Sequence, residues 1–427
     1  MSLEKYSYKT IVKTGMRMMH IKLLVLLVVF NAVSVVSAET NWNQWRGMQS
    51  DGHSDAANVP QSFSASSIVW KTKIPGRGQS SPIYWGERIY VTSSLENGSQ
   101  RAVYAVHRGT GKILWQKVVW QGDAESAHAM NNRASSTCVT DGKQVIAFFG
   151  KGGLHSLDAM TGDIQWSRDL GAFEGPWGTG ASPIIVGDLV VQNCDADNES
   201  SLMAFHRDSG KTAWKTQRDT IRGWSTPVIF RLKEQNEIVL NGHSQVISYN
   251  PANGAENWKC EAPGGRGTPT LAITSDAVIA IPGRTGFMIA IQPGGSGDVT
   301  GKRELWRVPR TGGRDLPSPI AVDDYVVITR LRPGLISCYQ VNDGKSLWTA
   351  RVEGAFSSSP IAINGVIYTV TEEGKIIVFK PGDKYTPIST SDIGADLEEV
   401  FRASPAAFEG HLLVRSDQFL YCLGDGK

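Results

Sequence analysis

The sequence predicts an all-β fold, an eight-bladed β-propeller in which a strand near the N-terminus closes the last blade. Three observations lead to this expectation: short apolar strands alternate with polar turns along most of the chain, a Ser/Thr-Pro step recurs before an apolar strand, and a turn glycine recurs ahead of a tryptophan. Regular self-similarity is typical of repeat architectures, and three or four short strands in each copy match one propeller blade.

The first residues have the pattern of an export signal. Five basic side chains precede an apolar run over residues 23–36, and Val36-Ser37-Ala38 offers the small residues of a cleavage site. A membrane anchor is the alternative, but the run is shorter than the roughly 20 apolar residues that span a bilayer. No cysteine follows the run to accept a lipid. We therefore expect residues 1–38 to be a Sec signal peptide, and the mature protein to be periplasmic or secreted with no integral membrane span.

The charge balance gives no indication of a nucleic-acid partner. The chain has 43 Lys and Arg against 41 Asp and Glu, and removal of residues 1–38 leaves 38 basic against 40 acidic residues, a net charge near −2. Nucleic-acid binding needs a concentrated basic face. We therefore expect no nucleic-acid partner.

The cysteines are too far apart for a metal or redox motif. The sequence contains no CxxC and no adjacent pair, which excludes zinc, thioredoxin-type and haem-attachment sites. Because the number is odd, at most two disulfides could form. We expect buried free thiols on strands, since unpaired cysteine is among the most buried residue types. The five positions are Cys138, Cys194, Cys260, Cys338 and Cys422.

The first repeat marker is a Ser/Thr-Pro step that opens the innermost strand of each blade. Proline suits the first residue of a strand because it has no N–H to donate to the ladder. An eighth copy, Ser136-Thr137-Cys138, lacks the proline. Counting these steps predicts eight blades. The seven copies with proline begin at Ser81, Ser182, Thr226, Thr268, Ser318, Ser359 and Ser404.

The second marker is a turn glycine that precedes a tryptophan, usually by four residues. Glycine supplies the positive φ of the turn, and a tryptophan that buries about 150–250 Å² can wedge between neighbouring blades. The last copy has degenerated to Thr386-Pro387-Ile388. The tryptophans at this repeat position are Trp70, Trp115, Trp166, Trp214, Trp258, Trp306 and Trp348.

Two incomplete repeats at the chain ends complement each other. The last blade begins at Ser404 and ends near Gly424 without a tryptophan strand, whereas the strand around Trp70 has no preceding strands of its own. We expect the N-terminal strand to complete the last blade, because an open solenoid would leave bare strand edges. The chain then divides into an N-terminal extension, residues 39–65, and the propeller, residues 66–427.

The repeat resembles that of the pyrroloquinoline-quinone (PQQ)-like propeller family, found in quinoprotein dehydrogenases and in the BamB-type outer-membrane assembly lipoprotein. Residues 155–166 are similar to its motif, roughly Ala-x-Asp-x-x-Thr-Gly-x-x-x-Trp. Residues 128–136 and 175–183 resemble stretches of secreted PQQ-like propellers of planctomycete-type bacteria. The resemblance covers almost the whole mature chain. It implies the fold and leaves the activity open, since the family contains both enzymes and binding propellers.

One mouth of the propeller channel is the candidate binding site. The residues a few positions before each Ser/Thr-Pro step lie on loops that converge there. Five guanidiniums and three aromatic rings suit a planar anionic ligand, because arginine pairs with carboxylates and aromatic rings offer stacking faces. The predicted funnel consists of Arg77, Arg133, Trp177, Trp224, Arg266, Arg314, Phe356 and Arg402.

A structural role for these arginines is the alternative. Each could bind loop carbonyls or pair with an acid that is close in sequence, and exposed ion pairs often carry no function. The neighbouring acids are Glu125, Glu174, Asp315, Glu353, Glu398 and Glu399.

Catalysis has little support in the residues. GxSxG, Walker A, HExxH and GxGxxG motifs are absent. The family resemblance implies that an alcohol-oxidising member would combine PQQ with Ca²⁺, an aspartate base and often a vicinal disulfide, and the cysteine spacing excludes the last. Asn131, Asn132 and Glu174 are candidate Ca²⁺ ligands of the hard oxygen type. His128 is a candidate for proton transfer, with a satisfied loop histidine as the alternative.

Three functions therefore remain open. The first is a non-enzymatic, monomeric scaffold similar to BamB that binds a protein partner in the cell envelope. The second is a PQQ-dependent quinoprotein oxidoreductase or a PQQ-binding sensor with Ca²⁺. The third is a propeller that binds or processes an anionic polysaccharide, so that the partner is either an envelope protein or a small anionic ligand.

Overall fold

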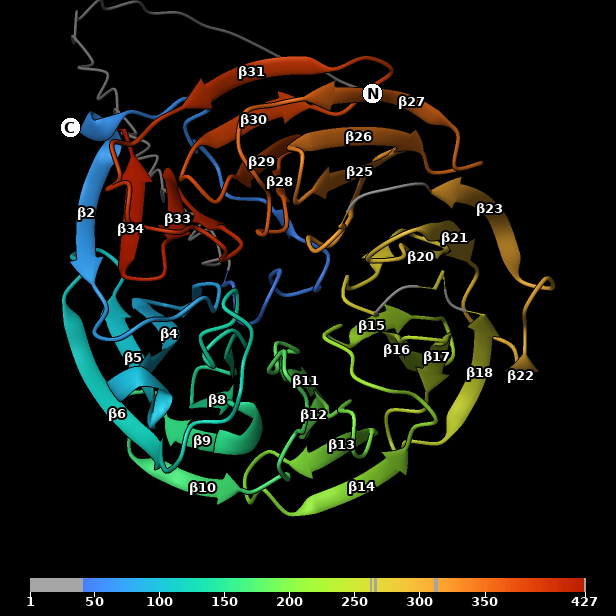
Figure 1. Ribbon diagram of the computed structural model, residues 1–427, viewed down its shortest axis with the longest axis horizontal. Helices are drawn as coiled ribbons and strands as arrows, with labels where there is room; N and C mark the ends of the chain where they lie inside the picture. The colour runs from blue at the N-terminus through green and yellow to red at the C-terminus, as the bar shows by residue number, and fades with distance from the viewer. Residues whose placement is uncertain (1–40, 262, 265–266, 311–313, 426–427) are drawn as a thin grey trace, which may run out of the picture. The chain divides into compact units, whose positions relative to one another are not determined.

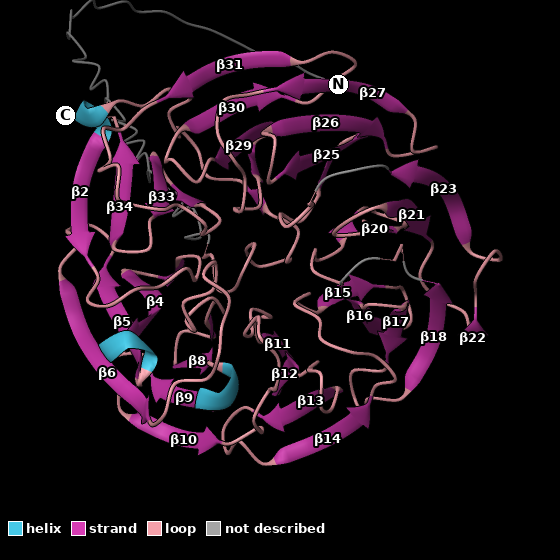
Figure 2. Ribbon diagram, viewed as in Figure 1, coloured by secondary structure: helices cyan, strands magenta, loops and turns pink. Residues whose placement is uncertain are grey.

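The computed structural model describes residues 41–261, 263–264, 267–310 and 314–425, so the predicted signal peptide, residues 1–38, lies outside the described residues. The described chain is all-β, with three short 3₁₀ turns as its only helical segments. Its strands form eight sheets arranged as the blades of a ring (Figures 1 and 2). The predicted eight-bladed β-propeller is confirmed. Within the described part of the chain, no helix has the length and apolarity to cross a membrane.

Each blade contains four antiparallel strands, numbered from the channel outward. Blade 1 comprises β3 (Ile83–Trp85), β4 (Arg88–Leu95), β5 (Gln100–His107) and β6 (Ile113–Gln121). Blade 2 comprises β7 (Val139–Thr140), β8 (Gln144–Phe148), β9 (Leu154–Asp158) and β10 (Ile164–Arg168). Blade 3 comprises β11 (Ile184–Val186), β12 (Leu189–Asn193), β13 (Ser201–His206) and β14 (Thr212–Gln217). Blade 4 comprises β15 (Val228–Arg231), β16 (Asn236–Asn241), β17 (Gln245–Tyr249) and β18 (Glu256–Glu261).

The second half repeats this order, with additions from elsewhere in the chain. Blade 5 comprises β19 (Ala272–Ile273), β20 (Val278–Ala280), β21 (Gly286–Ile291) and β23 (Glu304–Arg310), and β22 (Gly297–Asp298) joins blade 4. Blade 6 comprises β24 (Ile320–Val322), β25 (Tyr325–Arg330), β26 (Leu335–Gln340) and β27 (Ser346–Arg351). Blade 7 comprises β28 (Ile361–Ile363), β29 (Val366–Val370), β30 (Ile376–Lys380) and β31 (Thr386–Ser391), joined by β1 (His53–Ser54). Blade 8 comprises β32 (Ala406–Phe408), β33 (His411–Arg415), β34 (Phe419–Gly424) and β2 (Ile68–Lys73). The 3₁₀ turns are η1 (Ala65–Ser67), η2 (Glu96–Gly98) and η3 (Gly150–Gly152).

The ring closes as predicted. Strand β2 pairs antiparallel with β34, with Trp70 opposite Cys422, so the N-terminal strand is the outer strand of blade 8. The buried Arg415 guanidinium links blade 8 to blade 1, donating to the carbonyl oxygen of Ser80 at 2.8 Å and to that of Thr92 at 2.7 Å. Burial lowers the pKa of Arg415 to about 10, although the negative charge of Asp417 raises it in part.

The repeat tryptophans connect successive blades. In six cases the indole Nε1 donates to a backbone carbonyl in the next blade. The turn glycine has a second role besides its positive φ: a Cβ at Gly162 would lie 2.7 Å from the ring of Trp115 in the preceding blade. The six donor–acceptor pairs are Trp70–Arg108, Trp115–Ala159, Trp166–Arg207, Trp214–Pro251, Trp306–Val341 and Trp348–Gly382, at 2.5–3.2 Å.

Trp258 is the exception. Its Nε1 donates to Glu237 Oε2 in its own blade at 2.7 Å. Strand β22, which the connection within blade 5 carries, pairs with β18 beside this tryptophan, with Gly297 opposite Trp258. The turn glycine of blade 5, Gly301, therefore does not pack against Trp258, and a Cβ added at this position would meet no atom within 4 Å.

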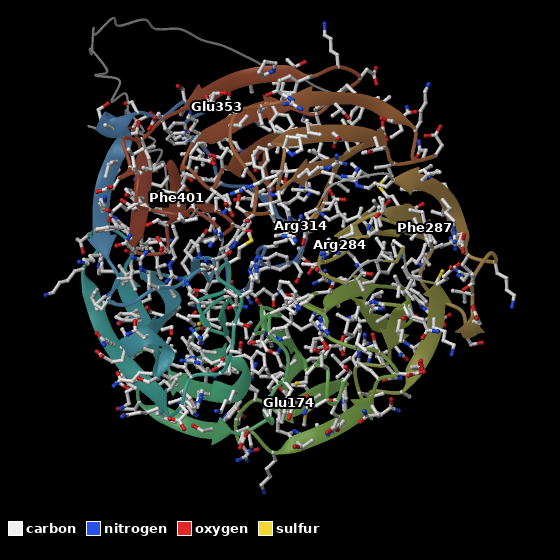
Figure 3. The ribbon with its side chains drawn as sticks, in the orientation of Figure 1. Glu174, Arg284, Phe287, Arg314, Glu353 and Phe401 are labelled. Carbon is white, nitrogen blue, oxygen red and sulfur yellow. The ribbon has the colours of Figure 1, made fainter. Side chains whose placement is uncertain are left out.

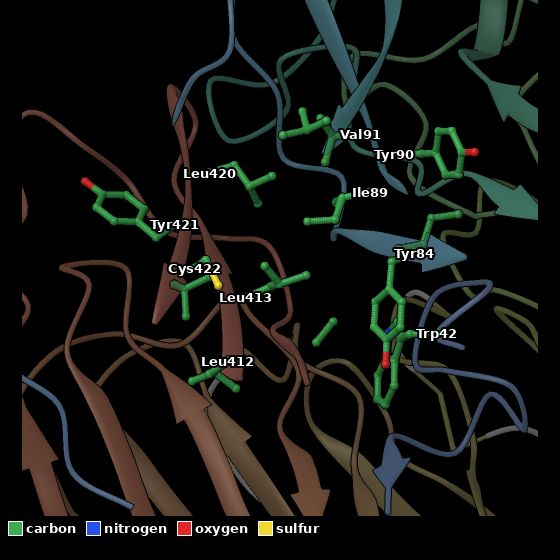
Figure 4. Close-up of a cluster of buried hydrophobic side chains, with 14 of the residues drawn as sticks. Trp42, Tyr84, Ile89, Tyr90, Val91, Leu412, Leu413, Leu420, Tyr421 and Cys422 are labelled. Atoms are coloured by element: carbon green, nitrogen blue, oxygen red, sulfur yellow. The ribbon is translucent and has the colours of Figure 1, made fainter. Parts of the chain in front are cut away.

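The core lies between the blades. The largest cluster joins the N-terminal extension to blades 1, 2, 7 and 8, and Figure 4 shows part of it, including Trp42, Tyr84, Leu413, Tyr421 and Cys422. Burial of this kind contributes about 25 cal/mol for each Å² of apolar surface removed from water. The cluster therefore fastens both chain ends to the ring.

All five cysteines are buried and free, which confirms the prediction. Burial raises the pKa of the Cys138 thiol to about 12, so this thiol stays protonated and unreactive at neutral pH.

A closed ring of hydrogen bonds surrounds the channel. One Ser or Thr of each blade donates its backbone N–H to the hydroxyl oxygen of the corresponding residue in the next blade, at 2.9–3.0 Å, and the last bond runs from Ser404 to Ser81. We call these residues the hydroxyl ring. In order, they are Ser81, Thr137, Ser182, Thr226, Thr270, Ser318, Ser359 and Ser404.

This ring corrects one predicted step. In blade 5 the equivalent residue is Thr270, followed by Leu271, and not Thr268 with Pro269. The Thr268-Pro269 pair lies two residues too early and resembles the step by coincidence. Blades 2 and 5 therefore both lack the proline.

The N-terminal extension crosses the channel. Trp42 forms a bridge with Tyr84 in blade 1, the Thr140 N–H in blade 2 donates to Asn43 O at 2.9 Å, and Arg46 donates to Pro319 O in blade 6 at 2.8 Å. Strand β1 then pairs parallel with β28 in blade 7. All these contacts lie one to four residues beyond the hydroxyl ring along the inner strands, so the extension forms a floor beneath it (Figure 1).

Candidate functional site

The opposite end of the channel is the mouth, which two sets of loops surround. One set joins the outer strand of each blade to the inner strand of the next, and the other joins the second strand to the third. The longest connections are residues 122–138 and 169–183, on the two sides of blade 2. Loops of this kind carry function on many rigid scaffolds, because their sequence is free of the packing demands of the blades.

Three adjoining cavities open at the mouth. Their volumes are about 220, 150 and 500 Å³, and Met130 lines all three. Trp224 lines the first and second, Arg314 the second and third, and Arg402 the first and third. Because the three cavities share these wall residues, together they form one continuous depression.

The predicted tryptophans of the funnel lie at this depression. Trp224 donates from Nε1 to the carbonyl oxygen of Gly178 at 2.7 Å, which fixes its ring at the cavity wall. Trp177 packs against His128 with 4.9 Å between ring centroids, and both line the second cavity. The mouth therefore has an aromatic side, formed by the loops before blades 2, 3 and 4.

The predicted arginines divide into two groups. Arg402 donates from Nε to the buried Glu372 at 2.8 Å, Arg133 donates to the carbonyl oxygen of Glu125 at 2.8 Å, and Arg77 forms an ion pair with Asp417. These three fit the structural alternative, although Asp417 and Glu372 were not among the predicted acids. Arg314 lines two cavities, and its guanidinium has no partner among the described residues.

Four members of the predicted funnel are not part of the described lining of the three cavities: Arg77 and Arg133, whose contacts are given above, and Phe356 and Arg266. Phe356 is completely buried in a hydrophobic cluster of blades 6 and 7, so its ring is not accessible from the mouth. Arg266 lies outside the described residues.

Other residues at the mouth escaped the sequence prediction. Arg284 lines the second cavity and Arg332 the third, and Figure 3 shows Arg284 and Arg314 near the centre of the ring. Both Arg284 and Arg332 lie on loops between second and third strands, whereas the prediction considered only the loops that enter the inner strands. A search that also included the loops between the second and third strands of each blade would have found both arginines.

Most of the acids considered as arginine partners bind other cations. Asp315 pairs with Arg310 at 2.6 Å in the interior, Glu125 with Arg101 at 2.6 Å, Glu353 with Lys375 at 2.6 Å and Glu399 with Lys71 at 2.8 Å. Glu174 and Glu398 are exposed and form no ion pair among the described residues. Among the described acids around the mouth, most negative charge is therefore neutralised, since Glu372 too is paired with Arg402 at 2.8 Å.

The calcium ligands that the family resemblance implies are not assembled here. Asn131 donates to the carbonyls of Trp177 and Thr179 at 3.2 and 2.7 Å, and its Oδ1 accepts the Arg133 N–H at 2.9 Å. The described residues contain no group of three His, Cys, Asp or Glu placed to hold a metal ion. Calcium prefers six to eight oxygen ligands, so these residues do not fit a PQQ–Ca²⁺ centre.

The remaining candidates also have structural contacts. Asn132 Oδ1 accepts the Ala134 N–H at 3.3 Å. Figure 3 shows Glu174 further from the centre of the propeller than Arg284 and Arg314. His128 Nδ1 accepts the Met130 N–H at 3.2 Å, as expected of a satisfied loop histidine. No carboxylate that would make His128 a base contacts it in the described chain.

The chain is similar in sequence to known proteins of two kinds. A sequence model of the family described as "Outer membrane protein assembly factor BamB" matches residues 62–176, 154–296 and 295–384. BamB of Salmonella typhimurium is 25% identical over 219 residues, which cover 50% of this chain and 50% of that protein. Quinohemoprotein alcohol dehydrogenase ADH IIB of Pseudomonas putida is 23% identical over 356 residues, covering 74% of this chain and 48% of that protein. The chain thus spans about half the length of each relative.

Solved structures share the architecture. The crystal structure of BamB from Moraxella catarrhalis superposes with a TM-score of 0.61 and 16% identity, covering 84% of this chain and 97% of that chain. At this identity the likeness shows the fold alone.

Proposed function

The chain belongs to the family of outer membrane protein assembly factor BamB, and from this premise we propose that it is a non-enzymatic, monomeric scaffold of the bacterial cell envelope that binds a protein partner. The family match over residues 62–384 carries the proposal. We assign the partner surface to the mouth, since that is where the repeat gives way to long, individual loops.

Exposed apolar side chains support the mouth as a protein-binding surface. Ile221, on the loop that enters blade 4, is 43% exposed, and Leu397, on the loop that enters blade 8, is fully exposed. Protein interfaces are also enriched in aromatic residues and Arg. The second cavity supplies such residues, which are Trp177, Trp224, Arg284 and Arg314.

Binding of a small anionic ligand is the second candidate, favoured by Arg284 and Arg314 beside Trp177 and Trp224. PQQ and an acidic polysaccharide both belong to this class. Because the calcium ligands are not assembled, we propose binding without alcohol oxidation.

Site-specific photo-crosslinking in the envelope tests the first proposal. A photoreactive residue replaces Ile221 or Leu397 at the mouth. The matched controls carry it on an outer strand, in place of Ile164 on β10 or Leu305 on β23, which are 40% and 48% exposed. We expect a discrete protein adduct from the mouth positions and none from the outer strands. Adducts confined to the outer strands, or dye-coupled alcohol oxidation by the purified mature protein with PQQ and Ca²⁺, would contradict the proposal.

A further inference from the structure

The hydroxyl ring has donors for which the chain supplies no acceptors. All eight ring residues line the cavity of about 220 Å³, and each is at most 5% exposed. Each oxygen accepts a backbone N–H, so its own O–H is left to donate. Among the described residues, Thr270 is the one ring member whose hydroxyl donates within the protein, to Thr226 O at 3.4 Å. Seven buried hydroxyl groups therefore need acceptors from whatever occupies the cavity.

The chemistry of these donors favours an oxyanion. A hydroxyl that accepts an N–H is polarised and becomes a stronger donor, because neighbouring hydrogen bonds reinforce one another. Hydrogen bonds to an ionised acceptor are shorter and roughly twice as strong as those between neutral groups. A circle of such donors around one axis is thus complementary to the oxygen atoms of an anion.

The charge of the cavity favours a single negative charge. Arg402 is the charged side chain in its described lining, and Glu372 already accepts its Nε–H at 2.8 Å. The guanidinium still has its Nη groups for a ligand, but Glu372 offsets part of its charge. A carboxylate matches this balance better than a phosphate dianion.

The shape of the cavity favours an apolar group attached to the carboxylate. Trp45, on the extension that crosses the channel, lines the cavity at its inner end, so a ligand enters from the mouth. Met130, Leu316 and Trp224 form apolar walls toward the mouth. The volume of about 220 Å³ would hold about seven water molecules at roughly 30 Å³ each, which is room for one small group.

We infer that the hydroxyl ring and its cavity form a site for a monocarboxylate carried by an apolar or aromatic group. The carboxylate meets the ring hydroxyls and Arg402, and the apolar group lies against Trp224 and Met130. Arg284 and Arg314, toward the mouth, attract the anion to the opening. The inference goes beyond the scaffold function and does not depend on it, because a free carboxylic acid and a polypeptide C-terminus present the same chemistry.

Isothermal titration calorimetry of the mature protein tests the inference with matched pairs. The first pair is 3-phenylpropionate and its amide, and the second is an acetylated tripeptide ending in phenylalanine, as the free acid and as the C-terminal amide. We expect each acid to bind at least about tenfold more tightly than its amide, a difference that removal of hydrogen bonds to a charged group produces. Binding of the peptide acid alone identifies a polypeptide C-terminus as the source, and comparable binding of both acids identifies any free carboxylate. Equal affinity of acid and amide, or no binding by any of the four compounds at millimolar concentration, overturns the inference.

Two variants locate the binding. Thr226→Val removes one ring hydroxyl and should weaken phenylpropionate about tenfold, with thermal denaturation as the check on folding because the N–H of Ser182 loses its acceptor. Ser135→Cys places a thiol in the cavity wall outside the ring, where alkylation is selective because the five native cysteines are buried. Phenylpropionate should slow its alkylation by iodoacetamide about fivefold, whereas the amide should not. Equal protection by both compounds, or by neither, would place the carboxylate elsewhere and refute the site.

Discussion

The hydroxyl ring and the mouth occupy the same channel but differ in what repeats. In the ring, eight residues from eight blades make the same hydrogen bond at 2.9–3.0 Å. At the mouth equivalent positions differ: Arg402 is paired with Glu372, whereas Arg314 has no partner in the described chain. The difference teaches that regular contacts hold the scaffold together, whereas the loops outside those contacts are free to differ from one blade to the next.

Opening the ring should have the largest effect. Deletion of residues 66–73 removes β2, which pairs with β34 and carries the buried Trp70. We expect the loss of a single cooperative unfolding transition, or of more than about 5 kcal/mol of unfolding free energy, a large share of the stability of a domain. Circular dichroism during thermal denaturation measures this. A deletion product that melts like the full-length protein would show that closure by β2 is dispensable.

Arg415 should come next, because it joins the two ends of the ring. Arg415→Met removes the buried donors to Ser80 and Thr92 and leaves their carbonyl oxygens in need of partners, at a cost of about 3 kcal/mol. Arg351→Ala on the exposed side of β27 is the control, with an expected change within about 0.5 kcal/mol. Equal denaturation midpoints for the two variants would contradict the bridging role.

The tryptophan contacts between blades should give a smaller effect that depends on the blade. Gly162→Ala places a Cβ 2.7 Å from the Trp115 ring, whereas Gly301→Ala meets nothing within 4 Å, and both glycines have positive φ. The strain of positive φ costs about 1–2 kcal/mol in each variant, so the additional loss in Gly162→Ala measures the contact with Trp115. Chemical denaturation gives both free energies. Equal losses of unfolding free energy in the two variants would mean that Gly162 is needed only for the positive φ of its turn and not for the contact with Trp115.

The mouth should give the smallest change in stability. Arg314→Ala removes a guanidinium with no partner among the described residues, and Leu397→Ala truncates a fully exposed side chain. Both should alter the unfolding free energy by less than about 0.5 kcal/mol. A larger loss would assign these side chains to the scaffold.

The sequence predicted the features that repeat. The tryptophan spacing and the Ser/Thr-Pro steps gave the number of blades, and the unmatched strand at Trp70 gave the closure. The assignment of Thr268 to the repeat was wrong because Pro269 imitates the step two residues before Thr270.

The sequence could not predict features that depend on distant contacts. The path of the extension rests on partners in several blades, as with Arg46 and Pro319, and no periodicity marks it. Phe356 and Trp224 occupy similar loop positions, yet the first is buried between blades and the second faces the cavity. Loop conformation decides between these outcomes, and the repeat contains no information about it.

The assignment of recognition to the mouth can be tested most directly with the crosslinker at position 397 and the additional changes Ile221→Ala and Arg314→Ala. If the mouth binds the partner, the protein adduct disappears while the denaturation midpoint stays within about 2 °C of that of the parent, as expected for surface changes of this size. An undiminished adduct in a protein of unchanged stability would contradict it.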